Sequence, residues 1–171
     1  MRSIIIIATL TFTMSMGAKA QKVFQEIFNS SNKTLYDARE DVEIRKIALF
    51  KVDALTYINT QILAKINDST KKLSEEQIAE KITRRDSLAY FLYDYIDVFT
   101  KEYSRYNKEK DRNRVMKIFR DASINNPLCN DADKQFVLAY YNREDFLTQF
   151  SLDTDWIKAY AEARRKLSGK Q

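Results

Sequence analysis

Apolar residues recur at intervals of three or four along most of the chain, which is the spacing of helices that bury one face. The spacing holds between residues 21 and 39, although the polar stretch 29–32 interrupts it. The next segment, 41–66, begins with Asp41, a favourable N-cap residue, and carries two adjacent apolar stripes. Because so wide an apolar arc is typical of a helix with more than one neighbour, we expect this helix to contact at least two others.

The longest predicted helix covers residues 74–107. It opens with Ser74 and Gln77, whose separation is that of a capping box. Nine positions from 78 to 106 follow a heptad spacing, and eight of the nine are apolar or aromatic, the exception being Arg85. The aromatic residues around 90–99 suggest a strand, but Asp94 and Asp97 lie three residues apart. That separation breaks a period of two and favours a helix.

Three shorter helices are predicted in the last third of the chain. One covers about 110–124 and ends before Pro127, since the residue that precedes proline disfavours helical angles. A short helix follows with Asn130 or Asp131 as its N-cap, and the last helix begins with Asp153 as its N-cap.

No linker, repeat or low-complexity block divides these segments. With so few glycines and prolines, a sandwich or barrel with a turn every 8 to 12 residues or so is excluded. The sequence therefore predicts an all-α fold. We expect an antiparallel helical bundle of five to six helices, two of them long, in a single domain over residues 21–171.

Residues 1–20 have the pattern of an export signal. Arg2 gives a charged start, residues 4–12 are apolar, and Ala18-Lys19-Ala20 forms a small-x-small cleavage site. The apolar run is much shorter than the roughly 20 residues that span a bilayer, and an uncleaved signal that stays as an anchor is the alternative. We expect cleavage between Ala20 and Gln21, which places the mature protein in the periplasm or outside the cell.

The composition excludes several classes of binding and catalytic site. Without Arg2 and Lys19 the formal net charge falls from +5 to +3, an excess too small for a dedicated nucleic-acid-binding protein. The chain has no His and one Cys, and only one Gly lies beyond residue 20. These counts exclude nucleophile–His pairs, His metal triads, phosphate-binding Gly loops and intramolecular disulfides. We therefore expect no catalytic site, no metal and no cofactor.

The best-placed carboxylates are Asp94 and Asp97, one helical turn apart and among three tyrosines. One interpretation makes them an acid and base that act on a glycan, or ligands of a hard cation such as Ca²⁺. The other makes them a solvated strip on the outside of a packed helix.

Three further residues are candidates for binding. Cys129 is the odd thiol of an exported chain, and it is either a buried free thiol or one that reacts or pairs between molecules. Tyr140 and Tyr141 combine an aromatic ring with a polar tip, which suits a pocket for a sugar or peptide as well as the rim of a core. Six basic residues between 108 and 120 indicate either weak polyanion binding or a solvated helix face.

Two resemblances concern short segments. The cleavage site followed by Gln, together with segments 126–134 and 151–156, resembles small exported helical proteins of unknown function from Gram-negative bacteria, which implies no activity. The sequence Leu-Ser-Glu-Glu-Gln at 73–77 is similar to the Leu-Thr-x-x-Gln motif of the Spy and CpxP family of periplasmic chaperones and stress regulators, which are all-helical cradles. This chain has Ser in place of Thr and one copy of a motif that the family carries twice.

From these features we expect an exported, soluble helical protein that acts without catalysis. It would bind a protein partner or associate with itself along the heptad positions. A periplasmic chaperone-like holdase or stress accessory protein is the first alternative, and a carboxylate-dependent glycan-acting enzyme is the second. We expect no binding of nucleic acid and no membrane contact except through an uncleaved signal.

Overall fold

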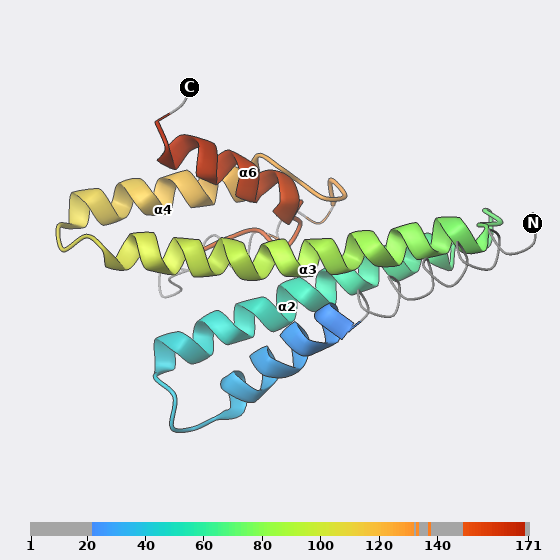
Figure 1. Ribbon diagram of the computed structural model, residues 1–171, viewed down its shortest axis with the longest axis horizontal. Helices are drawn as coiled ribbons and strands as arrows, with labels where there is room; N and C mark the ends of the chain where they lie inside the picture. The colour runs from blue at the N-terminus through green and yellow to red at the C-terminus, as the bar shows by residue number, and fades with distance from the viewer. Residues whose placement is uncertain (1–21, 132, 134–136, 138–148, 170–171) are drawn as a thin grey trace, which may run out of the picture.

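The computed structural model describes residues 22–131, 133, 137 and 149–169, and the regular elements in these ranges are all helices (Figure 1). A helical segment over 22–36 precedes α2 (Val42–Ile66), α3 (Glu75–Ser104), α4 (Glu109–Ile124) and α6 (Trp156–Leu167). The all-α prediction is confirmed, with two long helices as expected. None of the described helices is long and apolar enough to cross a membrane.

The helix α3 lies at the centre of the bundle (Figure 1). It contacts α2 on one side and both α4 and α6 on the other, and α4 contacts α6. The helical segment 22–36 runs beside α2, and successive helices reverse direction (Figure 1). The arrangement is thus an antiparallel bundle in which α3 separates two pairs of helices.

The predicted start of α3 is confirmed in detail. The Ser74 hydroxyl accepts a hydrogen bond from the Gln77 N–H at 3.2 Å, and the Gln77 side chain accepts one from the Ser74 N–H at 2.9 Å. This capping box satisfies two amides that the helix leaves without partners. The central heptad positions, including Leu92 and Ile96, are buried within the chain's own bundle.

The predicted N-cap of the last helix, Asp153, is wrong. Helix α6 begins with Trp156 and is capped by Asp155, whose carboxylate accepts a hydrogen bond from the Lys158 N–H at 3.4 Å and pairs with Arg84 at 3.0 Å. Asp153 lies in the loop before the helix and binds backbone amides elsewhere, so tertiary contacts decide between two aspartates that fit the cap pattern equally well.

An aromatic cluster forms the core between α3, α4 and α6, and Phe50 of α2 reaches into it. Six of its side chains are at most 1% exposed: Phe50, Tyr95, Phe99, Phe119, Phe150 and Trp156. Phe99 meets Phe119 and Phe150 edge-on, with ring centroids 5.3 and 5.1 Å apart. Burying each ring contributes about 1.5–3 kcal/mol, and such edge contacts add about 0.5–1.5 kcal/mol per pair.

The opposite side of α3 holds charge in its interior. Arg85, the exception in the heptad pattern, pairs with Asp86 at 2.9 Å and lies 4.6 Å above the ring of Phe24. Asp86 is 3% exposed, and its Oδ2 atom has no hydrogen-bond partner among the residues that the structure describes. Burial raises the pKa of Asp86, since the interior disfavours the ionised carboxylate.

Candidate functional site

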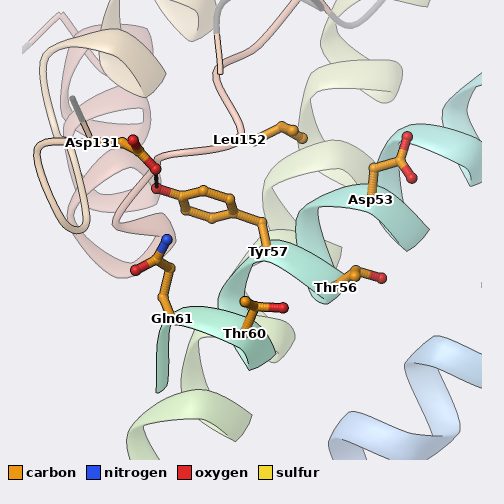
Figure 2. A pocket seen from close by; sticks show the side chains of 7 residues that line it. All are labelled: Asp53, Thr56, Tyr57, Thr60, Gln61, Asp131 and Leu152. Atoms are coloured by element: carbon orange, nitrogen blue, oxygen red, sulfur yellow. Dashed lines mark hydrogen bonds between the residues drawn. The ribbon is translucent and has the colours of Figure 1, made fainter. Parts of the chain in front are cut away.

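A pocket of about 440 Å³ lies between α2 and the loops that follow α4 and precede α6 (Figure 2). We call it the α2–loop pocket, and its volume is in the range of small-molecule sites. Its described lining is Asp53, Thr56, Tyr57, Thr60, Gln61, Asp131 and Leu152.

One wall of the α2–loop pocket is a single face of α2. Positions 53, 56, 57, 60 and 61 fall on consecutive turns, because residues three or four apart share a helix face. The intervening residues Ala54 and Ile58 are fully buried in the core. The helix therefore fixes a row of hydroxyl, amide and carboxylate groups around one aromatic ring.

Tyr57 joins this wall to the far side of the pocket. Its hydroxyl donates a hydrogen bond to Asp131 Oδ2 at 2.9 Å, as Figure 2 shows. Burial raises the pKa of Tyr57 well above its ordinary value, and the hydrogen bond to the Asp131 carboxylate adds to that shift. The phenol consequently stays protonated and keeps its role as a donor.

Asp153 holds the loop that carries Asp131 through hydrogen bonds to its backbone. One carboxylate oxygen of Asp153 accepts the Cys129 N–H at 2.8 Å, and the other accepts the Asp131 N–H at 2.9 Å. Asn130, between them, has a φ of 56°, a left-handed conformation that asparagine adopts more readily than most residues. Two loops far apart in sequence are thereby tied together, which fixes the position of Asp131.

A buried hydroxyl pair extends the same attachment into the core. Thr154 Oγ1 lies 2.7 Å from Ser123 Oγ and donates to the Ser151 carbonyl at 2.7 Å. The Asp155 N–H donates to the Asn126 carbonyl at 2.7 Å. Because these groups are buried and hydrogen-bonded, the loop before α6 is a rigid support for the pocket.

The pocket contains two carboxyl groups in different surroundings. Burial raises the pKa of Asp53, which is half-buried on α2. Asp131 accepts hydrogen bonds from the Tyr57 hydroxyl and from the Asp133 N–H, each at 2.9 Å.

A second pocket, of about 350 Å³, lies where the helical segment 22–36 meets α2 and α3, and we call it the three-helix pocket. Asp97, a candidate from the sequence, lines it together with Lys51 and Tyr93. The Asp97 carboxylate is paired with Lys101 on its own helix at 2.7 Å. Asp94 is half-buried one turn earlier and does not line this pocket.

The tyrosines near Asp94 and Asp97 divide between surface and core. Tyr90 and Tyr93 are exposed, whereas Tyr95 is fully buried and its hydroxyl donates to the Phe119 carbonyl. Within the described chain, no group of three or more His, Cys, Asp or Glu residues could hold a metal ion.

The other sequence candidates have different outcomes. Cys129 is a free, half-buried thiol whose Sγ lies 3.3 Å from Lys65 Nζ. Tyr140 and Tyr141 lie outside the described residues. In the basic segment 108–120, Lys117 pairs with Asp121 at 2.7 Å, and Arg112 donates to the Tyr106 carbonyl at 2.6 Å, so part of this charge is used within the chain.

Sequence reasoning missed the pocket residues of α2. Asp53, Thr56 and Thr60 form a polar row that could have been recognised as a possible binding face. Lys51 also carried a signal, because it stands in the middle of the apolar arc, where a cation is uncommon. Tyr57 and Asp131 are 74 residues apart, so no local sequence pattern indicates their contact.

The motif at 73–77 serves in this structure as the capping box of α3, a role that any helix start can have. No protein-family model, curated protein or solved structure matches the chain.

Proposed function

We propose that the protein is exported, is cleaved after Ala20, and works as a non-catalytic binding module that presents the α2–loop pocket to a ligand or partner. The observation that carries this proposal is the rigid frame of the pocket. A helix supplies one wall, and the Tyr57–Asp131–Asp153 bonds hold the other. Sites that are formed before binding lose less conformational entropy when the ligand arrives.

Apart from Asp53 and Asp131, the described lining is uncharged, which favours a hydroxyl- or amide-rich ligand such as a glycan or an extended peptide. Thr56, Thr60 and Gln61 offer neutral donors and acceptors, and the Tyr57 ring and Leu152 offer apolar contact. Neutral polar groups around an apolar surface are the usual composition of sites that bind such ligands. Self-association through the central heptad positions is not part of the proposal, because those side chains are buried in the core.

Site-specific photo-crosslinking in the cell envelope tests this function. A photoreactive residue replaces Thr60 in one variant and Ala161, which is exposed on α6, in the matched control. We expect one product of fixed stoichiometry, with a partner or a second copy, from position 60 and none from position 161. Equal products from both positions would contradict the proposal, and many unrelated unfolded clients would favour the chaperone-like holdase.

A neutral ligand is tested with the purified mature protein. Saturation-transfer NMR against short oligosaccharides and peptides should give signals that Thr60→Arg abolishes and Ala161→Arg leaves unchanged. N-terminal sequencing of the exported protein should begin at Gln21. A protein that keeps residues 1–20 would instead support the membrane-anchored alternative.

A glycan-acting enzyme is the second candidate, and the two carboxyl groups of the α2–loop pocket favour it. A carboxyl with a raised pKa, such as Asp53, suits a general acid, and a second carboxyl in the same pocket, Asp131, would supply the base or nucleophile. Release of reducing sugar from a glycan, lost in Asp53→Asn and kept in Asp97→Asn, would establish this activity. Binding without turnover would leave the non-catalytic function in place.

A further inference from the structure

The three-helix pocket is separate from the α2–loop pocket. At about 100° per residue, Ile44, Ile47, Ala48 and Lys51 lie on the side of α2 roughly opposite to the row from Asp53 to Gln61. A ligand in the three-helix pocket can therefore be tested independently of the function proposed for the α2–loop pocket.

Lys51 is the unusual group in this pocket. Its ammonium is half-buried and lies 4.7 Å from the centroid of the Tyr93 ring. No hydrogen bond or ion pair joins it to any residue in the described part of the chain. Asp97, the acidic group whose charge acts on Lys51, accepts a hydrogen bond from Lys101 instead. Burial lowers the pKa of Lys51, which shows that its charge is poorly solvated.

The other lining residues determine which groups a ligand with an anionic end on Lys51 would carry. Ser31 is 5% exposed, and no hydrogen bond links its hydroxyl to another residue that the structure describes. Ile44, Ile47 and Ile96 supply apolar walls, and Ile44 is 47% exposed. Among the described residues, an ammonium without an ion pair and a hydroxyl without a hydrogen bond therefore lie beside apolar side chains.

We propose that the three-helix pocket binds a small monocarboxylate with a compact apolar body. The carboxylate pairs with Lys51 and accepts a hydrogen bond from Ser31, and the apolar body lies against Ile44 and Ile47. One ammonium without an ion pair in the described chain, with the Asp97 carboxylate in the same pocket lining, matches one negative charge and repels a second. The site therefore prefers a monoanion to phosphate.

The mature protein is titrated with hexanoate and phenylacetate as probes, and NMR chemical shifts report binding. Hexanamide and phenylacetamide are the matched neutral controls, and inorganic phosphate tests for general anion binding. We expect saturable shifts at Tyr93 and Ile44 with both carboxylates. The amides should bind about tenfold more weakly or worse, because they lack the charge that pairs with Lys51.

Two variants locate the site. Lys51→Met, which keeps the length of the side chain without its charge, should weaken carboxylate binding by about tenfold or more, and Ser31→Ala should weaken it by about threefold. Lys65→Met, on the same helix but outside the pocket lining, is the control and should bind as the wild type does. Lys51→Met removes a half-buried charge that has no ion pair in the described chain, so the variant should remain folded.

Three outcomes would overturn the proposal. The first is the absence of saturable binding by either carboxylate. The second is equal affinity for carboxylate and amide, or for carboxylate and phosphate. The third is a Lys51→Met variant that binds hexanoate as tightly as the wild type.

Discussion

The two sides of α3 differ in how they are built. On the α4 and α6 side, aromatic rings fill the interior and the buried hydroxyls of Ser123 and Thr154 have partners. On the side of α2 and segment 22–36, apolar residues such as Leu55 and Ile58 are also fully buried. The interior there additionally contains the Arg85–Asp86 pair, Lys51 and the three-helix pocket. Both sides therefore contribute to the core, and the second also has the features of a binding surface.

The difference indicates where a small helical bundle can place a binding site. Charged and unpaired groups lower stability when they are buried, so a bundle tolerates them only where another part supplies the core. Here one helix, α3, serves both sides. Its Phe99 face packs in the aromatic cluster, and its Tyr93 and Asp97 face lines the three-helix pocket.

The largest predicted effect is on the free energy of unfolding, when a phenylalanine is replaced by alanine on each side of α3. Phe99→Ala should lower the free energy of unfolding by about 3–5 kcal/mol, because it leaves a cavity among fixed rings. Phe24→Ala should cost about half as much, since Phe24 is 8% exposed on a segment near the surface. Urea unfolding followed by circular dichroism measures both, and equal losses would remove the distinction.

The next effect concerns buried hydroxyls. Thr154→Val should cost about 1–3 kcal/mol, because Ser123 and the Ser151 carbonyl each lose a partner inside the core. Its control is Thr100→Val in the three-helix pocket, where the hydroxyl only donates to its own helix at the Ile96 carbonyl. That change should stay within about 0.5 kcal/mol in the same unfolding experiment. A loss at Thr100 equal to that at Thr154 would contradict the comparison.

Removal of the Tyr57 hydroxyl should have a smaller effect on stability and a specific effect on the α2–loop pocket. Tyr57→Phe should cost about 1–2 kcal/mol through the lost bond to Asp131. Hydrogen exchange should speed up at the amides of Cys129 and Asp131, and amides in α3 should keep their rates. Unchanged exchange at both loop amides would show that Tyr57 does not fix the loop.

The sequence predicted the helices well because their signals are local. The cap of α3 and the apolar stripes of α2 depend on residues within a few turns. The cap of α6 was misassigned because Asp153 and Asp155 look alike locally. Amides at Cys129 and Asp131, more than 20 residues away, decide between them.

The site was less predictable for the same reason. Its two pockets join residues from separate helices and loops, as the Tyr57–Asp131 bond shows. Of the candidates taken from the sequence, Asp97 lies in a pocket, and Cys129 lies in the loop that supports the other. Lys51 was visible as a charge within an apolar arc, but only the structure shows that it lies over the Tyr93 ring and has no ion pair in the described chain.

A smaller effect should appear in the pH dependence. The pKa of Asp86 is raised above its ordinary value of 3.8 by burial, so folding favours the protonated carboxyl. Stability that is absent at neutral pH is therefore gained as the pH falls through the folded-state pKa. From about pH 7 to about pH 4 the wild type should gain stability relative to Asp86→Asn, measured as the free energy of unfolding. Parallel plots of this free energy against pH for the two proteins would contradict a raised pKa of Asp86.

The smallest effect is expected at the carboxylates that the sequence singled out. Replacing both Asp94 and Asp97 by Asn should leave the unfolding free energy unchanged within error, because the Asp97–Lys101 pair is exposed to solvent and contributes little. Thermal unfolding at two salt concentrations checks this. A clear loss of stability at low salt would mean that the pair helps to hold the binding side together.

Native-state hydrogen exchange tests most directly whether α3 separates a stabilising side from a binding side. The account predicts that amides in α4, α6 and the centre of α3 exchange only through global unfolding. Amides in segment 22–36 should exchange through a local opening of lower free energy that leaves α4 and α6 protected. Equal protection of segment 22–36 and α6 at every denaturant concentration would contradict the account.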